Sequence, residues 1–217
     1  MKDIQLEIQK MNQGELLEEI LDIYTLKKAF KRVKKNKGAP GIDGITVDEY
    51  GQNLEEELKQ LKEETLSWSY KPTPVKRVEI PKSNGKGMRN LGIPIVKDRV
   101  LHMAIKMVSE PILDPTFSEN SYGFRPGRNQ EQAIQAAKRI VESGKEFVVD
   151  IDLSKFFDRI NHDRLIHRLK AQITDTRVLR LIGMILRSGV MIDGVKTPTE
   201  EGSVQGSLCK ALHNPPC

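Results

Sequence analysis

The chain has 217 residues, of which 38% are hydrophobic and 30% are charged, and its formal net charge is +5. This composition predicts a soluble globular chain of one domain or two small ones, and it excludes a disordered or membrane-spanning chain. The moderate positive charge is compatible with a polyanionic partner. The only cysteines, Cys209 and Cys217, lie near the C-terminal end, which offers neither a disulfide framework nor a zinc site and fits a reducing cytoplasm.

Helical periodicity dominates the beginning of the chain. Residues 1–22 space their apolar side chains as in an amphipathic helix, and a second predicted helix places Leu26, Phe30 and Val33 on one face. Seven of the eleven residues 27–37 are basic, which predicts either a surface for a phosphate backbone or a merely solvated helix face. The candidate nucleic-acid-binding residues in this stretch are Lys31, Arg32, Lys34 and Lys35.

A β-hairpin is predicted after a polar helix over residues 47–67. Residues 75–81 (VKRVEIP) and 88–93 (MRNLGI) have strand composition, and the Asn-Gly pair between them is a strong turn signal. Lys82 and Arg89 stand on opposite arms near the predicted tip. Two cations in this arrangement suit one anionic group such as a triphosphate, although exposed cations are common on hairpins.

A loop rich in aromatic residues, glycine and arginine follows, with the sequence SYGFRPGRN. Its last residue, Asn129, is followed by Gln132 in the pattern of a capping box, which predicts the start of a helix. Arg125 and Arg128 precede this helix N-terminus. A phosphate or a nucleic-acid strand is readily bound in such a position.

The segment on which the interpretation depends most is residues 147–162, FVVDIDLSKFFDRINH. Its β-branched and aromatic start predicts a buried strand on which Asp150 and Asp152 share one face. Carboxylates at the end of a buried strand are costly without a cation, so both are candidate ligands for Mg²⁺ in phosphoryl transfer. Taken alone, the pattern is also consistent with ordinary strand-end carboxylates or with caps of the following helix.

Two further helices and a second hairpin are predicted beyond this segment. Asn161 or Asp163 is the expected N-cap of the first helix, and Asp175 is the expected N-cap of the second. The hairpin VMIDGVK turns at its Asp-Gly pair. No internal repeat or low-complexity tract is present.

Four of these motifs together resemble the reverse transcriptase of bacterial group II introns, the intron-encoded maturase. They are GAPGIDG, the hairpin RVEIPK…MRNLGIP, the loop SYGFRPGRN and the segment VVDIDLSKFFDRINH, in the order of that family. The resemblance covers about residues 25–206. It implies an α+β fold, a right-hand polymerase with fingers and an incomplete palm, in which helices pack on antiparallel hairpins.

The resemblance also implies a catalytic centre. Asp152 is the expected first metal ligand, Asp150 is the second choice, and Phe157 is the expected steric gate that rejects a ribose 2′-hydroxyl. The implied mechanism is two-metal nucleotidyl transfer, in which Mg²⁺ lowers the pKa of a primer 3′-hydroxyl and stabilises charge on the transferred phosphate. No side-chain nucleophile is required.

Further positions match other blocks of the family. Lys82 and Arg89 match the residues expected to hold the incoming triphosphate. Arg125 and Arg128 match the block that lies along template and primer, and Gln205 matches the block behind the nascent base pair. The implied partners are group II intron RNA, an RNA template with a DNA primer, and a deoxynucleoside triphosphate, without a membrane partner.

The chain departs from the family pattern at its C-terminal end. The aromatic-Ala-Asp-Asp motif that supplies opposing carboxylates is absent, and residues 207–217 do not match. We hypothesise a frameshifted or misassembled end, which predicts negligible polymerase activity for this chain alone and leaves room for self-association through the incomplete palm. The expected organisation is a helical extension at 1–24, fingers at 25–145, a partial palm with the first catalytic strand at 146–206 and an aberrant tail at 207–217.

Two other functions remain open at this point. One is a catalytically incomplete RNA-binding maturase fragment, which grips intron RNA without any chemistry. The other is a different Mg²⁺-dependent nucleic-acid enzyme, such as an RNase H-like nuclease. That enzyme needs more acidic residues on neighbouring strands, and the only close extras, Glu146 and Asp158, are not well placed. The RNA-directed DNA polymerase family is therefore the preferred interpretation.

Overall fold

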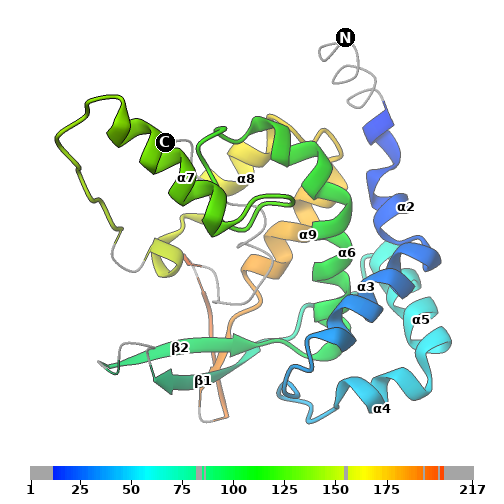
Figure 1. Ribbon diagram of the computed structural model, residues 1–217. Helices are drawn as coiled ribbons and strands as arrows, with labels where there is room; N and C mark the ends of the chain where they lie inside the picture. Colours follow the sequence, from blue (N-terminus) through cyan, green and yellow to red (C-terminus); the bar gives the residue numbers. More distant parts are fainter. Residues whose placement is uncertain are drawn as a thin grey trace.

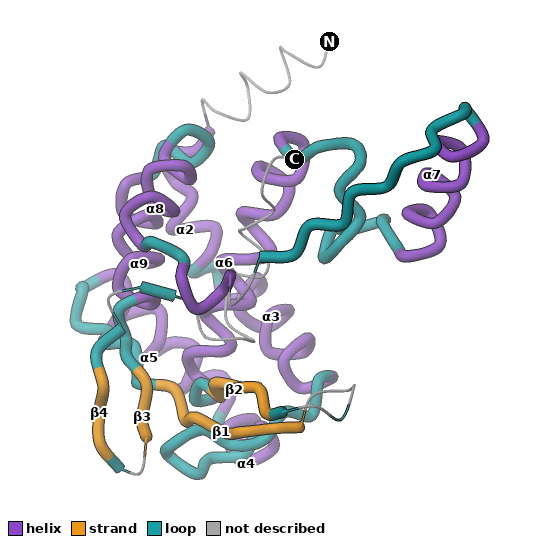
Figure 2. The backbone as a smooth tube through the Cα atoms, turned by 90° about the vertical axis from the view of Figure 1, so that its left-hand side faces the viewer, coloured by secondary structure: helices purple, strands orange, loops and turns teal. Residues whose placement is uncertain are grey.

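The computed structural model describes residues 12–81, 85, 87–153, 156–192, 194–199 and 201–202. Within these residues the chain forms a helical body, a small mixed sheet and a projecting arm (Figures 1 and 2). None of the described helices is long and apolar enough to cross a membrane. The helical elements are η1 (Asn12–Glu15), α2 (Leu16–Ile20), α3 (Ile23–Lys35), α4 (Val47–Gln52), α5 (Leu54–Leu66), α6 (Val96–Leu113), η2 (Asp114–Thr116), α7 (Gln130–Glu142), η3 (Phe156–Arg159), α8 (His162–Lys170) and α9 (Thr176–Leu186).

Helix α6 is the centre of the hydrophobic core. Its side chains Leu101 and Ile105 are fully shielded from solvent, and α3 and α2 pack against it (Figure 1). The inward face of α3 carries the predicted Leu26, Phe30 and Val33. Each fully buried side chain of this size stabilises the fold by about 1.5–3 kcal/mol. The helical periodicity of the sequence therefore determined this part of the fold.

Side-chain caps determine where several helices begin. The predicted capping box of α7 is present, because Asn129 and Gln132 each accept the other's backbone N–H through their side chains. Asn161 caps α8 by accepting a backbone N–H at 2.9 Å, and Asp175 caps α9 in the same way at 3.0 Å. All three predicted caps are confirmed, with Asn161 and not Asp163 at the start of α8.

The polar helix predicted over residues 47–67 is instead two helices. Asn53 separates α4 from α5 with a backbone φ of −114° and ψ of 33°, which lies outside the helical region. Helix α4 has its own capping box, formed by Thr46 and Glu49. The apolar spacing continues across the break, so periodicity alone did not reveal it.

The two predicted hairpins belong to one sheet. Strands β1 (Val75–Pro81) and β2 (Met88–Ile93) pair antiparallel, as do β3 (Val190–Ile192) and β4 (Val195–Thr197). A short parallel pairing of β1 with β3 joins them in the order β2-β1-β3-β4. Hairpin signals are local, so the parallel join was not predicted.

The prediction of a buried strand over residues 147–152 is wrong. Helix α7 and the extended segment 145–153 project from the body, and we call residues 130–153 the arm (Figures 1 and 2). No described strand pairs with this segment, and the side chains of Phe147, Val149 and Ile151 are 91%, 80% and 78% exposed. A strand needs a neighbour for its N–H and C=O groups, so strand-like composition without a paired neighbour gives only an extended chain.

Asp98 joins the first turn of α6 to the chain that enters β1. It is 1% exposed and accepts the Tyr70 hydroxyl at 2.6 Å and the Thr73 backbone N–H at 2.9 Å. Burial raises the pKa of Asp98 to about 6, although these two hydrogen bonds oppose the rise. The ionised carboxylate is therefore less favourable in the folded protein than in the unfolded chain.

We expect Asp98→Asn to change how stability depends on pH. Because the folded-state pKa lies above the unfolded one, protonation of Asp98 stabilises the fold at low pH, and this contribution is lost as pH rises through about 6. In urea unfolding, the stability of the wild type relative to Asp98→Asn should fall by up to about 3 kcal/mol between about pH 4 and pH 8. The exposed Asp43, changed to Asn, is the matched control. Parallel pH dependences of the wild type and Asp98→Asn would contradict this assignment.

Candidate nucleic-acid and nucleotide site

The two predicted metal ligands, Asp150 and Asp152, lie on the extended part of the arm and are exposed. Carboxylate oxygens are the ligands that Mg²⁺ prefers, but two side chains fill only part of its octahedral shell. Among the residues that the structure describes, no group of three His, Cys, Asp or Glu side chains is arranged to hold a metal ion. The described residues therefore do not form a complete Mg²⁺ site.

Phe157, the predicted steric gate, belongs to the body of the protein and not to the arm. It lies in η3, and its ring meets that of Phe156 nearly edge-on, with 5.5 Å between the centroids. Both rings are partly buried and pack against the hydrophobic core. Packing therefore fixes the predicted gate, whereas nothing in the described structure fixes the predicted metal ligands.

A backbone contact joins the last described residues to the chain that follows Phe157. The Gly202 N–H donates to the Ile160 carbonyl at 2.7 Å, and the His162 ring forms a 2.6 Å hydrogen bond with the Gly202 carbonyl. Gly202 has a φ of +84°, and a Cβ there would lie 2.7 Å from a backbone carbonyl oxygen, so the position requires glycine. The chain at Gly202 thus passes beside η3. Gln205 itself lies outside the described residues.

The β1–β2 hairpin carries the predicted triphosphate-binding residues. Arg89 pairs with Ile80 across the hairpin, one position from its last paired residues, so its backbone lies near the tip as predicted. The Arg89 side chain and the whole of Lys82 lie outside the described part of the chain. Their contact with a triphosphate stays a prediction.

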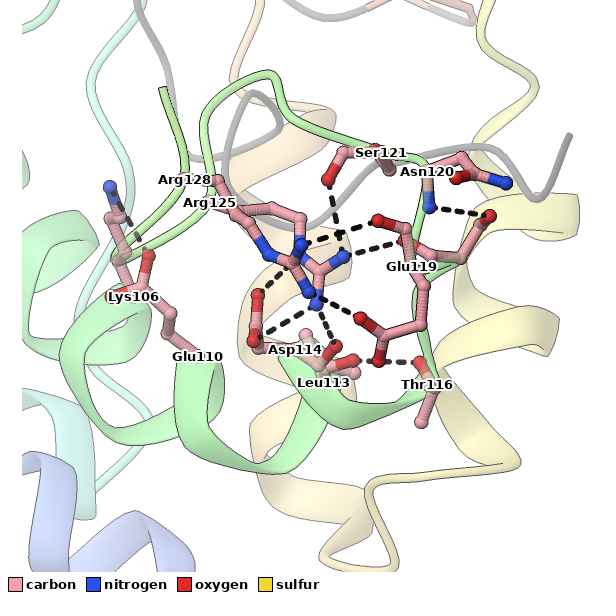
Figure 3. Close-up of polar contacts among 11 residues, drawn as sticks. Lys106, Glu110, Leu113, Asp114, Thr116, Glu119, Asn120, Ser121, Arg125 and Arg128 are labelled. Atoms are coloured by element: carbon pink, nitrogen blue, oxygen red, sulfur yellow. Dashed lines mark hydrogen bonds and ion pairs between the residues drawn. The ribbon is translucent and has the colours of Figure 1, made fainter. Parts of the chain in front are cut away.

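The guanidinium of Arg125 uses all five of its N–H donors within the protein (Figure 3). It meets both carboxylate oxygens of Asp114, at 2.7 and 3.2 Å, and also donates to the Asp114 carbonyl at 3.0 Å. The remaining donors contact the carbonyls of Ser118 and Ser121 at 2.6 and 3.2 Å. A phosphate can reach this residue, which is 8% exposed, only by displacing one of these acceptors. In this conformation Arg125 is the residue that fixes the loop.

Arg128 is held more loosely. It forms an ion pair with the Glu119 carboxylate and donates to the Glu119 carbonyl at 3.3 Å (Figure 3). Its guanidinium also lies 5.6 Å from the centre of the Tyr122 ring. The side chains of Arg128 and Glu119 are 27% and 85% exposed. Exposed pairs of this kind are weak, so a phosphate can replace the carboxylate. Of the two predicted arginines, Arg128 is the one available to a nucleic acid.

Sequence reasoning missed the acidic partners of these arginines. Asp114 and Glu119 lie eleven and nine residues before Arg125 and Arg128. No helical or strand period brings residues at such separations together, so only the conformation of the loop creates these pairs. The one sequence signal that could have indicated these ion pairs is the presence of a carboxylate shortly before each arginine.

The basic face of α3 is exposed as predicted. Lys31, Arg32 and Lys35 all face solvent, and among the described residues none of them forms an ion pair. Lys34 is also exposed and pairs with Asp48 at 2.9 Å, and this hydrogen bond lowers the pKa of Asp48. The helix thus presents several cations on one surface, opposite its buried apolar face.

A comparison with known families identifies the chain. The family model described as "Reverse transcriptase (RNA-dependent DNA polymerase)" matches residues 80–209, more than half of the chain. The chain belongs to the reverse transcriptase family. The match includes the end of β1, all of β2, the arginine loop, the arm and η3, which are the parts of the chain that carry most of the predicted site residues.

Several curated relatives of the chain are intron-encoded proteins. "Protein YkfC" of Escherichia coli (strain K12) is 37% identical over 193 residues, which cover 86% of this chain and 50% of that protein. "Group II intron-encoded protein LtrA" of Lactococcus lactis subsp. cremoris is 34% identical, over 88% of this chain and 31% of that protein. The "Putative COX1/OXI3 intron 1 protein" of Saccharomyces cerevisiae is 31% identical, over 94% of this chain and 24% of that protein. The predicted resemblance is confirmed, and the chain spans half or less of the length of these relatives.

Solved structures share the fold. The "Partial Cas6-RT-Cas1--Cas2 complex" matches with a TM-score of 0.60 and 21% sequence identity, over 91% of this chain and 33% of that chain. This likeness confirms the predicted α+β reverse transcriptase fold. At this level of identity it shows the fold alone.

We expect Arg125→Lys to destabilise the protein more than Arg128→Lys. A lysine at position 125 has three donors in place of five and leaves buried acceptors unpaired, which costs about 2–3 kcal/mol. The exposed pair of Arg128 contributes less than about 1 kcal/mol. Urea unfolding monitored by circular dichroism measures both. Equal losses of stability would contradict the structural role of Arg125.

Proposed function

We propose that the chain is the fingers and the first part of the palm of an RNA-directed DNA polymerase of the group II intron type. The observation that carries this proposal is the family match over residues 80–209, because it includes the tip and second strand of the hairpin, the loop and the aspartate segment in one continuous stretch. We assign the fingers to residues 25–145 and the partial palm to residues 146–206. The partners that follow are intron RNA, an RNA template with a DNA primer, and a deoxynucleoside triphosphate.

The proposed contacts fall into two groups, one for the incoming nucleotide and one for the RNA. Lys82 and Arg89 hold the triphosphate, and Phe157 rejects a ribose 2′-hydroxyl. Arg128 and the basic face of α3 follow the phosphate backbone of the RNA. The exposure of Lys31, Arg32 and Lys35 supports the assignment of α3, since phosphate contacts require free donors at the surface. The assignment of Arg128 is supported less directly, because a phosphate must replace its weak pair with Glu119.

The catalytic step requires more carboxylates than the described residues supply. Bound Mg²⁺ stabilises charge in nucleotidyl transfer, and Asp152 and Asp150 are its proposed ligands in this chain. Both are exposed and no third ligand accompanies them in the described structure, so the described residues alone would hold the metal only weakly. We propose that this chain alone binds RNA without extending a primer, which is the second function considered above. The exposed apolar side chains of the arm also favour self-association.

We expect no primer extension by this chain with an RNA template, a DNA primer and Mg²⁺. Positioning supplies most of the rate in phosphoryl transfer, and the aspartates on the arm are not positioned. Gel analysis of a labelled primer should show the same products for the wild type, Asp152→Asn and a reaction without protein. Extension that Asp152→Asn abolishes would contradict the proposal that this chain alone is inactive.

We expect the double substitution Lys31→Gln/Lys35→Gln to weaken RNA binding. Two lost phosphate contacts on a single strand should lower the slope of log affinity against log salt by about 1.4. Fluorescence anisotropy of a labelled single-stranded RNA, measured over a range of salt concentrations, provides the test. Lys59→Gln/Lys62→Gln on α5 is the control, because it removes the same charge from another helix. An identical salt slope for the two variants would refute the role of α3.

A further inference from the structure

A basic hollow lies between α8, α9, β4 and the segment that enters β1. Its volume is about 740 Å³. Of its described lining residues only Asp163 is acidic, and this carboxylate pairs with Arg187 at 2.7 Å. Positive charge therefore remains in excess. The cationic side chains of the lining are Lys71, Lys170, Arg180, Arg187 and Lys196.

The hollow also has an apolar part. Ile166 of α8 and Leu179 and Met184 of α9 contribute to its lining, beside the backbone of Gly183. An apolar surface of this kind suits a flat nucleobase, and the surrounding cations suit phosphates. Pockets of this size with a few convergent polar groups are typical ligand sites.

An aromatic residue orients one of the cations. The Arg180 guanidinium lies 4.1 Å from the centre of the Trp68 ring, which is a close cation–π contact. Single-stranded nucleic acids are commonly held by aromatic and arginine planes on which bases stack, together with a positively charged groove. Trp68 does not itself line the hollow, but it is the only tryptophan of the chain, so its fluorescence reports on the surroundings of Arg180, which does.

The hollow is separate from the proposed polymerase surface. Figure 2 shows α9 on one side of α6 and the arm on the other. We propose that the hollow binds a nucleotide unit of a single-stranded RNA segment, with its base against the apolar lining and its phosphates on Lys71 and Lys170. This inference rests on the proposed function only in taking RNA as the polyanion. It adds a second RNA contact at a distance from the aspartates.

The test titrates the whole chain with a fluorescein-labelled single-stranded RNA of about 12 nucleotides, a length that one binding surface of this kind accommodates. RNA anisotropy reports total binding, and Trp68 emission reports occupancy of the hollow. Lys71→Gln/Lys170→Gln removes two exposed lysines that form no ion pair among the described residues. Lys59→Gln/Lys62→Gln is again the matched control.

We expect Trp68 emission to change with the same midpoint as the anisotropy in the wild type and in the control. In Lys71→Gln/Lys170→Gln the change in Trp68 emission should need more RNA. The slope of log affinity against log salt should fall by about 1.4 for this variant. Saturating anisotropy with unchanged Trp68 emission, or unaltered binding by Lys71→Gln/Lys170→Gln, would overturn this inference and leave the proposed function standing. If Lys31→Gln/Lys35→Gln keeps both the Trp68 response and the RNA affinity measured by anisotropy, the proposed RNA contact on α3 is refuted and the hollow is supported. If neither anisotropy nor Trp68 emission shows RNA binding, both proposed RNA contacts are refuted.

Discussion

A β-strand depends on its neighbours, because its backbone N–H and C=O groups are paired only across a ladder. This constraint decides the state of residues 145–153, which have strand composition but no described strand beside them. Their apolar side chains face solvent, and Asp150 and Asp152 are carried with them. Nucleotidyl transfer depends on carboxylates held in position. The absence of a described partner strand therefore bears both on the conformation of the arm and on how firmly the two aspartates are held.

Packing and hydrogen bonds hold the elements of the body in place, whereas the segment 145–153 of the arm has no described strand beside it. Helix α6 is enclosed by α2 and α3, and Asp98 ties its first turn to the chain that enters β1 through two hydrogen bonds. The surfaces proposed to bind RNA, on α3 and around α8 and α9, lie on these packed elements. The proposed binding residues thus occupy packed helices, while the proposed metal ligands Asp150 and Asp152 occupy a segment that pairs with no described strand.

Local signals allowed much of this fold to be predicted from the sequence. The β1–β2 hairpin and the caps Asn129, Asn161 and Asp175 each depend on a few neighbouring residues, and all are confirmed. The state of residues 147–152 could not be predicted, because strand composition does not reveal whether a partner is present. The five-donor arrangement of Arg125 likewise arises from loop geometry, which the sequence does not reveal. Its position before a helix and its motif match therefore both suggested a phosphate contact there.

Hydrogen exchange of the whole chain, followed by mass spectrometry, tests the central claim most directly, because it reports backbone pairing segment by segment. The account predicts that the amides of residues 147–152 exchange at the rate of an unstructured peptide, while those of α6 are strongly protected. The β1–β2 hairpin serves as an internal reference for paired strands. Protection of residues 147–152 equal to that of the hairpin would show a paired strand in solution and would contradict the account.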